Sequence, residues 1–194
     1  WNKLLDSVPG TQLRRLVQDA TLQVPGAPFA LCAPLAEQAG YSAVYLSGAG
    51  FSAAALALPD TGLFSLDELV VQAERLCRAS NLPVIVDADT GFGNVSECVA
   101  QLERAGVAAI QVEDQTFPKR CGHLEGKQVV PVEEMCEKLL VNIPLDIKNN
   151  IVKLAISSTS GTLTACNLRG DPIGEAIPYH QACDENKILI KSIT

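Results

Sequence analysis

Two segments of the chain repeat one pattern, and this repeat is the feature that most constrains the fold. "AEQAGYSAVYLS" (36–47) and "LERAGVAAIQVE" (102–113) each give the end of a helix, an Ala-Gly turn and then a strand. Strand–helix units joined by short turns predict right-handed crossovers and a parallel sheet. The sequence therefore predicts an α/β fold for this part of the chain.

Further strands and helices alternate over residues 1–139. Short buried strands are predicted at 27–33, 41–47, 82–89 and 107–114. Helical spacing of apolar residues predicts helices at 11–20, 65–80 and 94–106, with Ser65 and Asn94 suited to N-cap positions. Four such units indicate the first half of a (β/α)₈ TIM barrel, and the first strand is not followed by the GxGxxG sequence of a Rossmann sheet.

Composition narrows the classes of partner and compartment. Hydrophobic residues make up 47% of the 194 residues, and the net charge of −7 argues against binding to nucleic acid or to an anionic membrane surface. The cysteines are odd in number, at seven, and form no CxxC pair, which favours free thiols in a reducing compartment. Cys32, Cys77, Cys98 and Cys136 are expected in core packing. We expect a cytoplasmic protein, or a mitochondrial matrix protein if a leader preceding Trp1 was removed.

The strand–helix alternation stops near Leu139. Residues 151–179 are predicted to form two or three strands separated by turns, including the hairpin signal "NLRGDP" (167–172). We place a boundary between residues 139 and 150, so that 1–139 is the partial barrel and 140–194 is a small β-rich appendage.

Acidic side chains follow two of the predicted strands. Asp87 and Asp89 alternate in an extended segment, and Glu113 and Asp114 end the next strand. Functional side chains of a parallel α/β barrel gather at these strand ends. A lone DxD also occurs as a strand-end cap or turn, but the flanking glycines and the second acidic pair favour a Mg²⁺ site, with Mn²⁺ as an alternative ion.

The segment "EDQTFPKRCGHLEGK" (113–127) places one thiol among cations. Cys121 follows Lys119 and Arg120 and precedes His123 by two residues. Nearby cations lower the pKa of a thiol, which suits proton transfer or nucleophilic attack near neutral pH. The alternative is an ordinary loop thiol.

The motifs taken together resemble the isocitrate lyase/phosphoenolpyruvate mutase superfamily, in particular its methylisocitrate lyase-type members. The resemblance rests on four segments: "GYSAVYLSGAG", "LPDTGLFSLDEL", "PVIVDADTGFG" and "VEDQTFPKRCGH". It covers residues 1–139 and implies the first half of a (β/α)₈ barrel that forms homo-oligomers. The cysteine of "KRCGH" favours lyases over the phosphonate-forming mutases.

The resemblance also implies roles for individual residues. Asp87 would be the principal Mg²⁺ ligand, with Asp89 and Glu113 acting through metal-bound water. Cys121 would be the acid that protonates the departing carbanion, in a mobile loop. The remaining implied roles are catalytic support by Lys119, His123 and Glu113, and substrate binding by Ser47, Gly48, Ala49, Asp60, Arg120 and Gly122. Ala49 stands where many lyases have glycine.

The implied reaction is Mg²⁺-dependent cleavage of a small 2-hydroxy acid, with 2-methylisocitrate giving pyruvate and succinate. Oxaloacetate decarboxylation is an alternative, and so is a catalytically silent fusion fragment. The last follows from residues 140–194, where the family's next strands, with their substrate-binding arginine and later glutamate, are not found. Residues 143–185 resemble instead an internal piece of an FGGY ribulose/xylulose-type kinase, without its nucleotide-binding start or catalytic aspartate.

Overall fold

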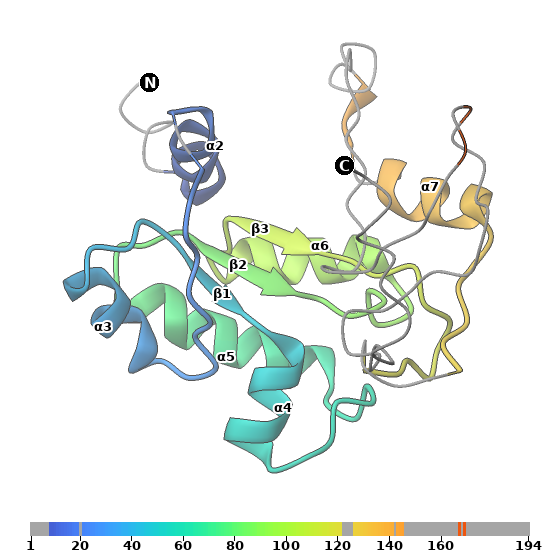
Figure 1. Cartoon of the computed structure of the whole chain (residues 1–194), viewed down its shortest axis with the longest axis horizontal. Helices are drawn as coiled ribbons and strands as arrows, with labels where there is room; N and C mark the ends of the chain where they lie inside the picture. The colour runs from blue at the N-terminus through green and yellow to red at the C-terminus, as the bar shows by residue number, and fades with distance from the viewer. Residues whose placement is uncertain are drawn as a thin grey trace. The chain divides into compact units, whose positions relative to one another are not determined.

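A three-stranded parallel sheet lies at the centre of the protein (Figure 1). The structure, a computed structural model, describes residues 8–19, 21–121, 126–141, 143–145, 167 and 169. The strands are β1 (Val44–Leu46), β2 (Val84–Asp87) and β3 (Ala109–Gln111), in that order across the sheet. Leu46 pairs with Val86, and Asp87 pairs with Gln111, so the carboxyl ends of the strands lie at one edge.

A fourth extended segment lies beside β1. Gly26 forms a parallel bridge with Tyr45, and the Tyr45 amide donates a hydrogen bond to the carbonyl of Pro25. The predicted strand at 27–33 is therefore wrong in its position: the extended part precedes it, and α3 (Cys32–Gln38) already begins within it. The other three predicted strands are confirmed, each shorter than predicted.

Helices connect the parallel strands. α4 (Gly48–Leu56) and α5 (Leu66–Ala79) lie between β1 and β2, and α6 (Val95–Arg104) lies between β2 and β3. α2 (Pro9–Asp19) precedes the sheet and α7 (Val132–Leu140) follows it, which completes the helices of the described residues. The predicted helices correspond to α2, α5 and α6.

Two helix starts form as the sequence predicts. The Ser65 hydroxyl accepts a hydrogen bond from the Glu68 amide, and the Glu68 carboxylate accepts one from the Ser65 amide, which is a reciprocal capping box. The Asn94 side chain accepts a hydrogen bond from the Glu97 amide at the start of α6. These caps satisfy backbone donors that the first turn of a helix leaves without a partner.

The core lies between the sheet and α3, α5 and α6. Val44, Leu46, Val84 and Val86 are fully buried on this face, against the apolar sides of the helices. The intervening residues Tyr45 and Ile85 are only partly buried, because they point to the opposite face of the sheet. That face and the carboxyl edge of the strands are where polar side chains gather.

The cysteines and the helices can be compared with what the sequence predicts. Cys98 is buried and Cys32 and Cys77 are half-buried, but Cys136 is exposed on α7, so core packing is wrong for this thiol. No helix in the described residues has both the length and the apolar character needed to cross a membrane.

The chain divides into two compact units, residues 1–150 and 151–194. In the second unit the structure describes only Asn167 and Arg169, and the predicted strands of the β-rich appendage lie outside the described residues. The Asn167 side chain accepts a hydrogen bond from the Arg169 amide at 2.9 Å, an arrangement typical of turns and consistent with the "NLRGDP" signal.

Candidate active site

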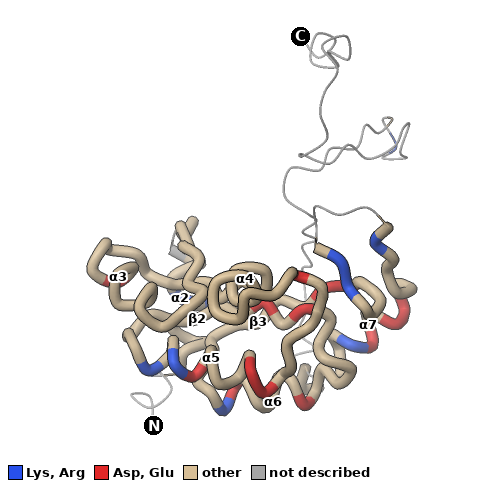
Figure 2. The backbone as a smooth tube through the Cα atoms, turned by 90° about the horizontal axis from the view of Figure 1, so that it is seen from below, with Lys and Arg blue, Asp and Glu red and all other residues tan. Residues whose placement is uncertain are grey.

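Carboxylates gather at the carboxyl ends of β1, β2 and β3. Asp87 is the last residue of β2, Asp89 follows it by two residues, and Glu113 follows β3 by two. Both aspartates are buried, and the Glu113 amide donates a hydrogen bond to the Asp89 carbonyl at 2.7 Å, which joins the two strand ends. Figure 2 shows acidic segments between β3 and α7. Asp114 is exposed and does not join the cluster.

The two aspartates converge for a different reason from the one the sequence suggests. Strict alternation along an extended strand is expected, but Asp89 has left the strand, with φ of 48°. Its amide donates a hydrogen bond to Asp87 Oδ1 at 3.2 Å. A turn therefore brings the two carboxylates together, and aspartate is among the few residues that adopt this left-handed conformation readily.

The start of α4 forms the wall of this cluster. Ser47 caps the helix by accepting a hydrogen bond from the Gly50 amide at 3.2 Å, and the Gly48 amide donates to Asp87 Oδ2 at 3.1 Å. A Cβ added at Gly48 would lie 3.1 Å from Asp87 Oδ2 and 3.2 Å from Asp89 Oδ1. A larger residue at position 48 would therefore require the two carboxylates to shift by a few tenths of an ångström.

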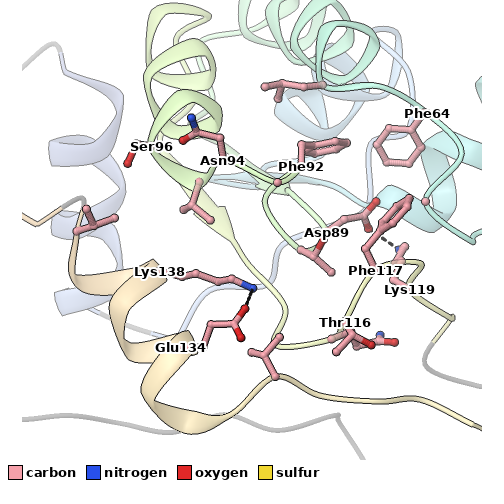
Figure 3. A pocket seen from close by; sticks show the side chains of 18 residues that line it. Phe64, Asp89, Phe92, Asn94, Ser96, Thr116, Phe117, Lys119, Glu134 and Lys138 are labelled. Atoms are coloured by element: carbon pink, nitrogen blue, oxygen red, sulfur yellow. Dashed lines mark ion pairs between the residues drawn. The ribbon is translucent and has the colours of Figure 1, made fainter.

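Lys119 enters the cluster from the loop after β3. Its side chain is 3% exposed, and its ammonium lies 2.6 Å from Asp60 Oδ1 and also pairs with Asp89 Oδ1. Figure 3 shows Lys119 pointing toward Asp89. Because the Lys119 ammonium is buried and pairs with both aspartates, it is a structural part of the carboxylate cluster. The sequence predicts Lys119 as a cation that activates Cys121, and this role stays a prediction.

Negative charge accumulates among these groups. Burial, and to a smaller extent the charges of Asp87 and Asp60, raise the pKa of Asp89 to about 6, although the Lys119 ammonium lowers it. Burial and the charge of Asp87 also raise the pKa of Glu113. The pKa of Tyr45 is raised for the same reasons, and its hydroxyl donates a hydrogen bond to Gln111 Oε1 at 3.0 Å. The site therefore holds more carboxylate charge than its lysine offsets.

Gln115 connects the carboxylates to the thiol loop, and sequence reasoning missed it. Its buried side chain donates hydrogen bonds to Glu113 Oε2 at 2.8 Å and to the Arg120 carbonyl at 2.9 Å. The Arg120 amide in turn donates to Gln115 Oε1 at 3.1 Å. The backbone just before Cys121 is thus fixed to Glu113. Only its position directly after the acidic pair could have indicated this role.

Cys121 and its neighbours are described in part. Cys121 is half-buried and Arg120 is exposed, and both make interactions within the chain. Gly122 and His123, predicted in substrate binding and catalysis, lie outside the described residues. Ser47 is the N-cap of α4, Ala49 lies in the first turn of this helix, and Asp60 follows the helix.

The donor set of the cluster fits a hard cation such as Mg²⁺. Asp89 Oδ2 is buried and has no hydrogen-bond partner among the described residues, so one carboxylate oxygen is free to bind a cation or its water. No three carboxylate, His or Cys side chains of the described residues are close enough to form a metal site by direct ligation alone. Mg²⁺ usually keeps several waters and needs only one or two carboxylates, so the unpartnered Asp89 Oδ2 is the observation that favours an ion here.

A cavity of about 950 Å³ opens beside Asp89 and Lys119 (Figure 3). It extends to α7, where Lys138 and Glu134 form an ion pair at 3.0 Å. Three phenylalanines line it, at positions 64, 92 and 117. Its size is within the range of cavities that bind small molecules, and its walls combine apolar and polar side chains as such cavities do.

Comparison with known protein families identifies the family of this chain. A sequence profile of the phosphoenolpyruvate phosphomutase family matches residues 13–166. The chain belongs to this family. The match extends beyond residue 139, and the predicted boundary there stays a prediction.

Several relatives are lyases by name. The chain is 48% identical over 139 residues to a 2-methylisocitrate lyase of Aeropyrum pernix, which covers 70% of this chain and 45% of the relative. It is 40% identical over 148 residues to a 2,3-dimethylmalate lyase of Eubacterium barkeri, covering 74% and 51%. The chain spans about half the length of the curated relatives that it matches.

Solved structures agree with the fold. A crystal structure of 2,3-dimethylmalate lyase, described as a PEP mutase/isocitrate lyase superfamily member, matches with a TM-score of 0.64 and 36% identity over 70% of this chain and 47% of that one. Phosphonopyruvate hydrolase in complex with oxalate and Mg²⁺ matches with a TM-score of 0.59 and 34% identity over 70% and 47%. This solved structure thus holds Mg²⁺ together with oxalate, a dicarboxylate.

Proposed function

We propose that this chain carries the metal-binding and proton-donating half of a carbon–carbon lyase site for 2-methylisocitrate-like 2-hydroxy acids. The observation that carries the proposal is the Gln115 bridge, which fixes the backbone of the Cys121 loop to a carboxylate of the cluster. Names of the relatives support the same chemistry. On this reading the extended segment at Gly26 and the three strands β1, β2 and β3 correspond to the first four strands of a (β/α)₈ barrel.

Asp87 would hold Mg²⁺ directly, with Asp89 and Glu113 bound to its water. A Mg²⁺ ion held there would act as a Lewis acid toward the hydroxyl and the adjacent carboxylate of the substrate, which would favour loss of the hydroxyl proton as the carbon–carbon bond breaks. Mn²⁺ accepts the same oxygen ligands and is the alternative ion. The unpartnered Asp89 Oδ2 and the excess of carboxylates support this assignment.

The first turn of α4 would bind a carboxylate of the substrate. Helix N-termini attract anions because backbone amides point outward and the helix dipole is positive there. Ser47, Gly48 and Ala49 form this turn, and Gly48 already contacts Asp87. The acid would thus lie between amide donors and the metal-binding carboxylates, with the cavity beside Asp89 receiving the rest of the molecule.

Cys121 would supply the proton. Once a base has taken the hydroxyl proton of 2-methylisocitrate, breaking of the carbon–carbon bond gives pyruvate and a carbanion on the succinate portion. The thiol would protonate this carbanion as general acid and become a thiolate. Asp60, Lys119 and Arg120 would support the site, and Gly122 and His123 would complete the loop. Oligomerisation, as in the parent family, is part of the same proposal.

Release of pyruvate from 2-methylisocitrate in the presence of MgCl₂ tests the proposal. We expect Mg²⁺-dependent pyruvate in a coupled assay, and a loss of about 10²–10⁴-fold on Cys121→Ala, the scale of general-acid catalysis. Cys136→Ala is the matched control, because this thiol is exposed on α7 and should leave the rate unchanged. Mg²⁺ binding without keto acid from any candidate acid would refute the lyase.

Two alternatives make different predictions. An oxaloacetate decarboxylase would release CO₂ from oxaloacetate. Lyase cleavage of 2-methylisocitrate releases no CO₂. A silent fragment would give no product from either acid. The resemblance of residues 143–185 to an FGGY kinase fragment stays a prediction, and we propose no kinase activity from it.

A further inference from the structure

One lysine is built into the carboxylate cluster from the thiol loop. Lys119 pairs with Asp60, which follows α4, and with Asp89, which follows β2. The side chains of the lysine, Asp60 and Asp89 are 3%, 15% and 5% exposed, so little water screens these pairs. The ammonium therefore lies directly beside carboxylates of the proposed metal site.

The same carboxylate serves both cations. Asp89 Oδ1 pairs with Lys119, whereas Asp89 Oδ2 is buried without a hydrogen-bond partner among the described residues. A metal ion whose water binds Asp89 would lie close to the ammonium. Like charges at such short range in a buried site repel strongly.

We propose that Lys119 is a built-in counter-cation that competes with the divalent metal for Asp89, with Asp60 keeping the ammonium when Asp89 turns to the metal. The inference rests on the metal site of the proposed function. It assigns Lys119 a role in setting metal affinity, separate from any role beside Cys121. Without metal, Lys119 offsets the buried charge of Asp89. With metal, Asp89 would exchange its contact with Lys119 for one with the metal or its water.

Calorimetric titration of MgCl₂ alone into metal-free protein tests the competition. Lys119→Met removes the ammonium but keeps much of the side-chain volume, and we expect the Kd for Mg²⁺ to fall by about tenfold or more, equivalent to ~1.4 kcal/mol. Arg78→Met is the charge-matched control: it removes one positive charge from the outer surface of α5, where Arg78 pairs with Glu74. This control should leave the Kd within twofold of the wild type.

A second variant tests the part played by Asp60. Asp60→Asn leaves Asp89 as the sole carboxylate partner of the ammonium among the described residues, so we expect weaker Mg²⁺ binding than in the wild type. In the Lys119→Met background the same change should have little effect, because the competing charge is gone. Such non-additivity is the expected sign of two residues that act through one contact.

Protein stability gives a readout independent of calorimetry. Lys119→Met leaves Asp60 and Asp89 buried without their cation, so metal-free protein should melt at a lower temperature. MgCl₂ should then raise the Tm of this variant more than that of the wild type. If the variant does not fold even with MgCl₂, the comparison of Asp60→Asn with the wild type decides the proposal.

The possible failures are distinguishable. Equal or weaker Mg²⁺ binding by Lys119→Met, with binding retained by the wild type, would overturn the competition and leave the proposed metal site standing. Absence of Mg²⁺ binding by both proteins at millimolar concentrations would overturn the metal site and the competition together. Binding by the variant alone supports both.

Discussion

Asp89 combines several features that a purely structural residue rarely has together. Its φ of 48° lies in the left-handed region, it is buried, and one of its carboxylate oxygens lacks a hydrogen-bond partner among the described residues. Left-handed backbone at a non-glycine residue costs on the order of 1 kcal/mol and tends to persist at functional sites. The carboxylate is also shared between a lysine and the predicted metal. These features together favour the proposed functional role of Asp89.

The pKa of Asp89 predicts how stability depends on pH in the absence of metal. Burial raises this pKa to about 6, from 3.8 in the unfolded chain. Between these values the folded state holds a proton that the unfolded state has lost, so the contribution of Asp89 to stability falls as pH rises from 4 to 6. The change is on the order of 3 kcal/mol, since each pKa unit corresponds to about 1.4 kcal/mol.

Denaturant unfolding in the presence of a metal chelator, at pH 4 and at pH 6, tests this pH dependence of the contribution of Asp89 to stability. The difference in free energy of unfolding between Asp89→Asn and the wild type should shift in favour of the variant as pH rises, because asparagine does not titrate. Comparing the two proteins cancels the titration of groups that they share. A difference that is constant across this range would show that the folded-state pKa of Asp89 is not raised.

At the scale of elements, the site forms where β2 ends and α4 begins. Gly48 and Gly50 lie in the same first turn of α4, but they have different surroundings. A Cβ at Gly48 would meet the carboxylates of Asp87 and Asp89, whereas a Cβ at Gly50 would meet Ser47 and Pro28 at ordinary contact distances of 3.5 and 3.6 Å. Substitution of the two glycines therefore distinguishes an effect on the carboxylate cluster, at Gly48, from an effect on the stability of α4, at Gly50.

We predict opposite outcomes for the two glycines. Gly48→Ala should push the carboxylates apart and weaken Mg²⁺ binding by about 10–100-fold, the scale for loss of a group that orients a ligand. Gly50→Ala should leave Mg²⁺ affinity unchanged and stabilise the helix by up to ~1 kcal/mol, because alanine has the higher helix propensity. Metal titration and thermal melts measure both, and equal Mg²⁺ affinity of the two variants would contradict the role given to Gly48.

The elements were largely predictable from sequence, and the details of the site were not. Ser65 and Asn94 are recognisable caps because the pattern is local, and three strands follow from runs of buried β-branched and aliphatic residues. The first strand was misplaced because a short apolar run such as "APFALCA" fits the start of a buried helix as well as it fits a buried strand. Periodicity also could not place the turn at Asp89.

Long-range contacts explain the other misses. Lys119 reaches Asp60 across 59 positions of sequence, a pairing that local charge patterns around Cys121 do not indicate. Gln115 bonds both to a strand end and to the loop backbone, and no spacing rule predicts such a bridge. The carboxylates were predictable because parallel strands bring their carboxyl ends to one edge.

At the scale of the whole molecule, the chain contains the strand ends that hold the carboxylates and the loop that holds the thiol. It spans about half the length of its curated relatives, and β3 pairs with only one neighbouring strand among the described residues. The groups that we propose to bind the metal all lie in the described residues: they come from β2, from β3 and from the segments that follow these strands or α4. Metal binding can therefore be tested on this chain independently of turnover.

Calorimetric titration of MgCl₂ into the metal-free wild type and Asp87→Asn tests the central claim most directly. Asparagine keeps the shape of Asp87 and can still accept the Gly48 amide hydrogen bond, but it lacks the charge that would ligate Mg²⁺. We predict saturable binding by the wild type and a loss of more than about tenfold in the variant, with both proteins folded by thermal melt. Equal affinity of the two proteins for Mg²⁺ would contradict the assignment of this cluster as the metal site.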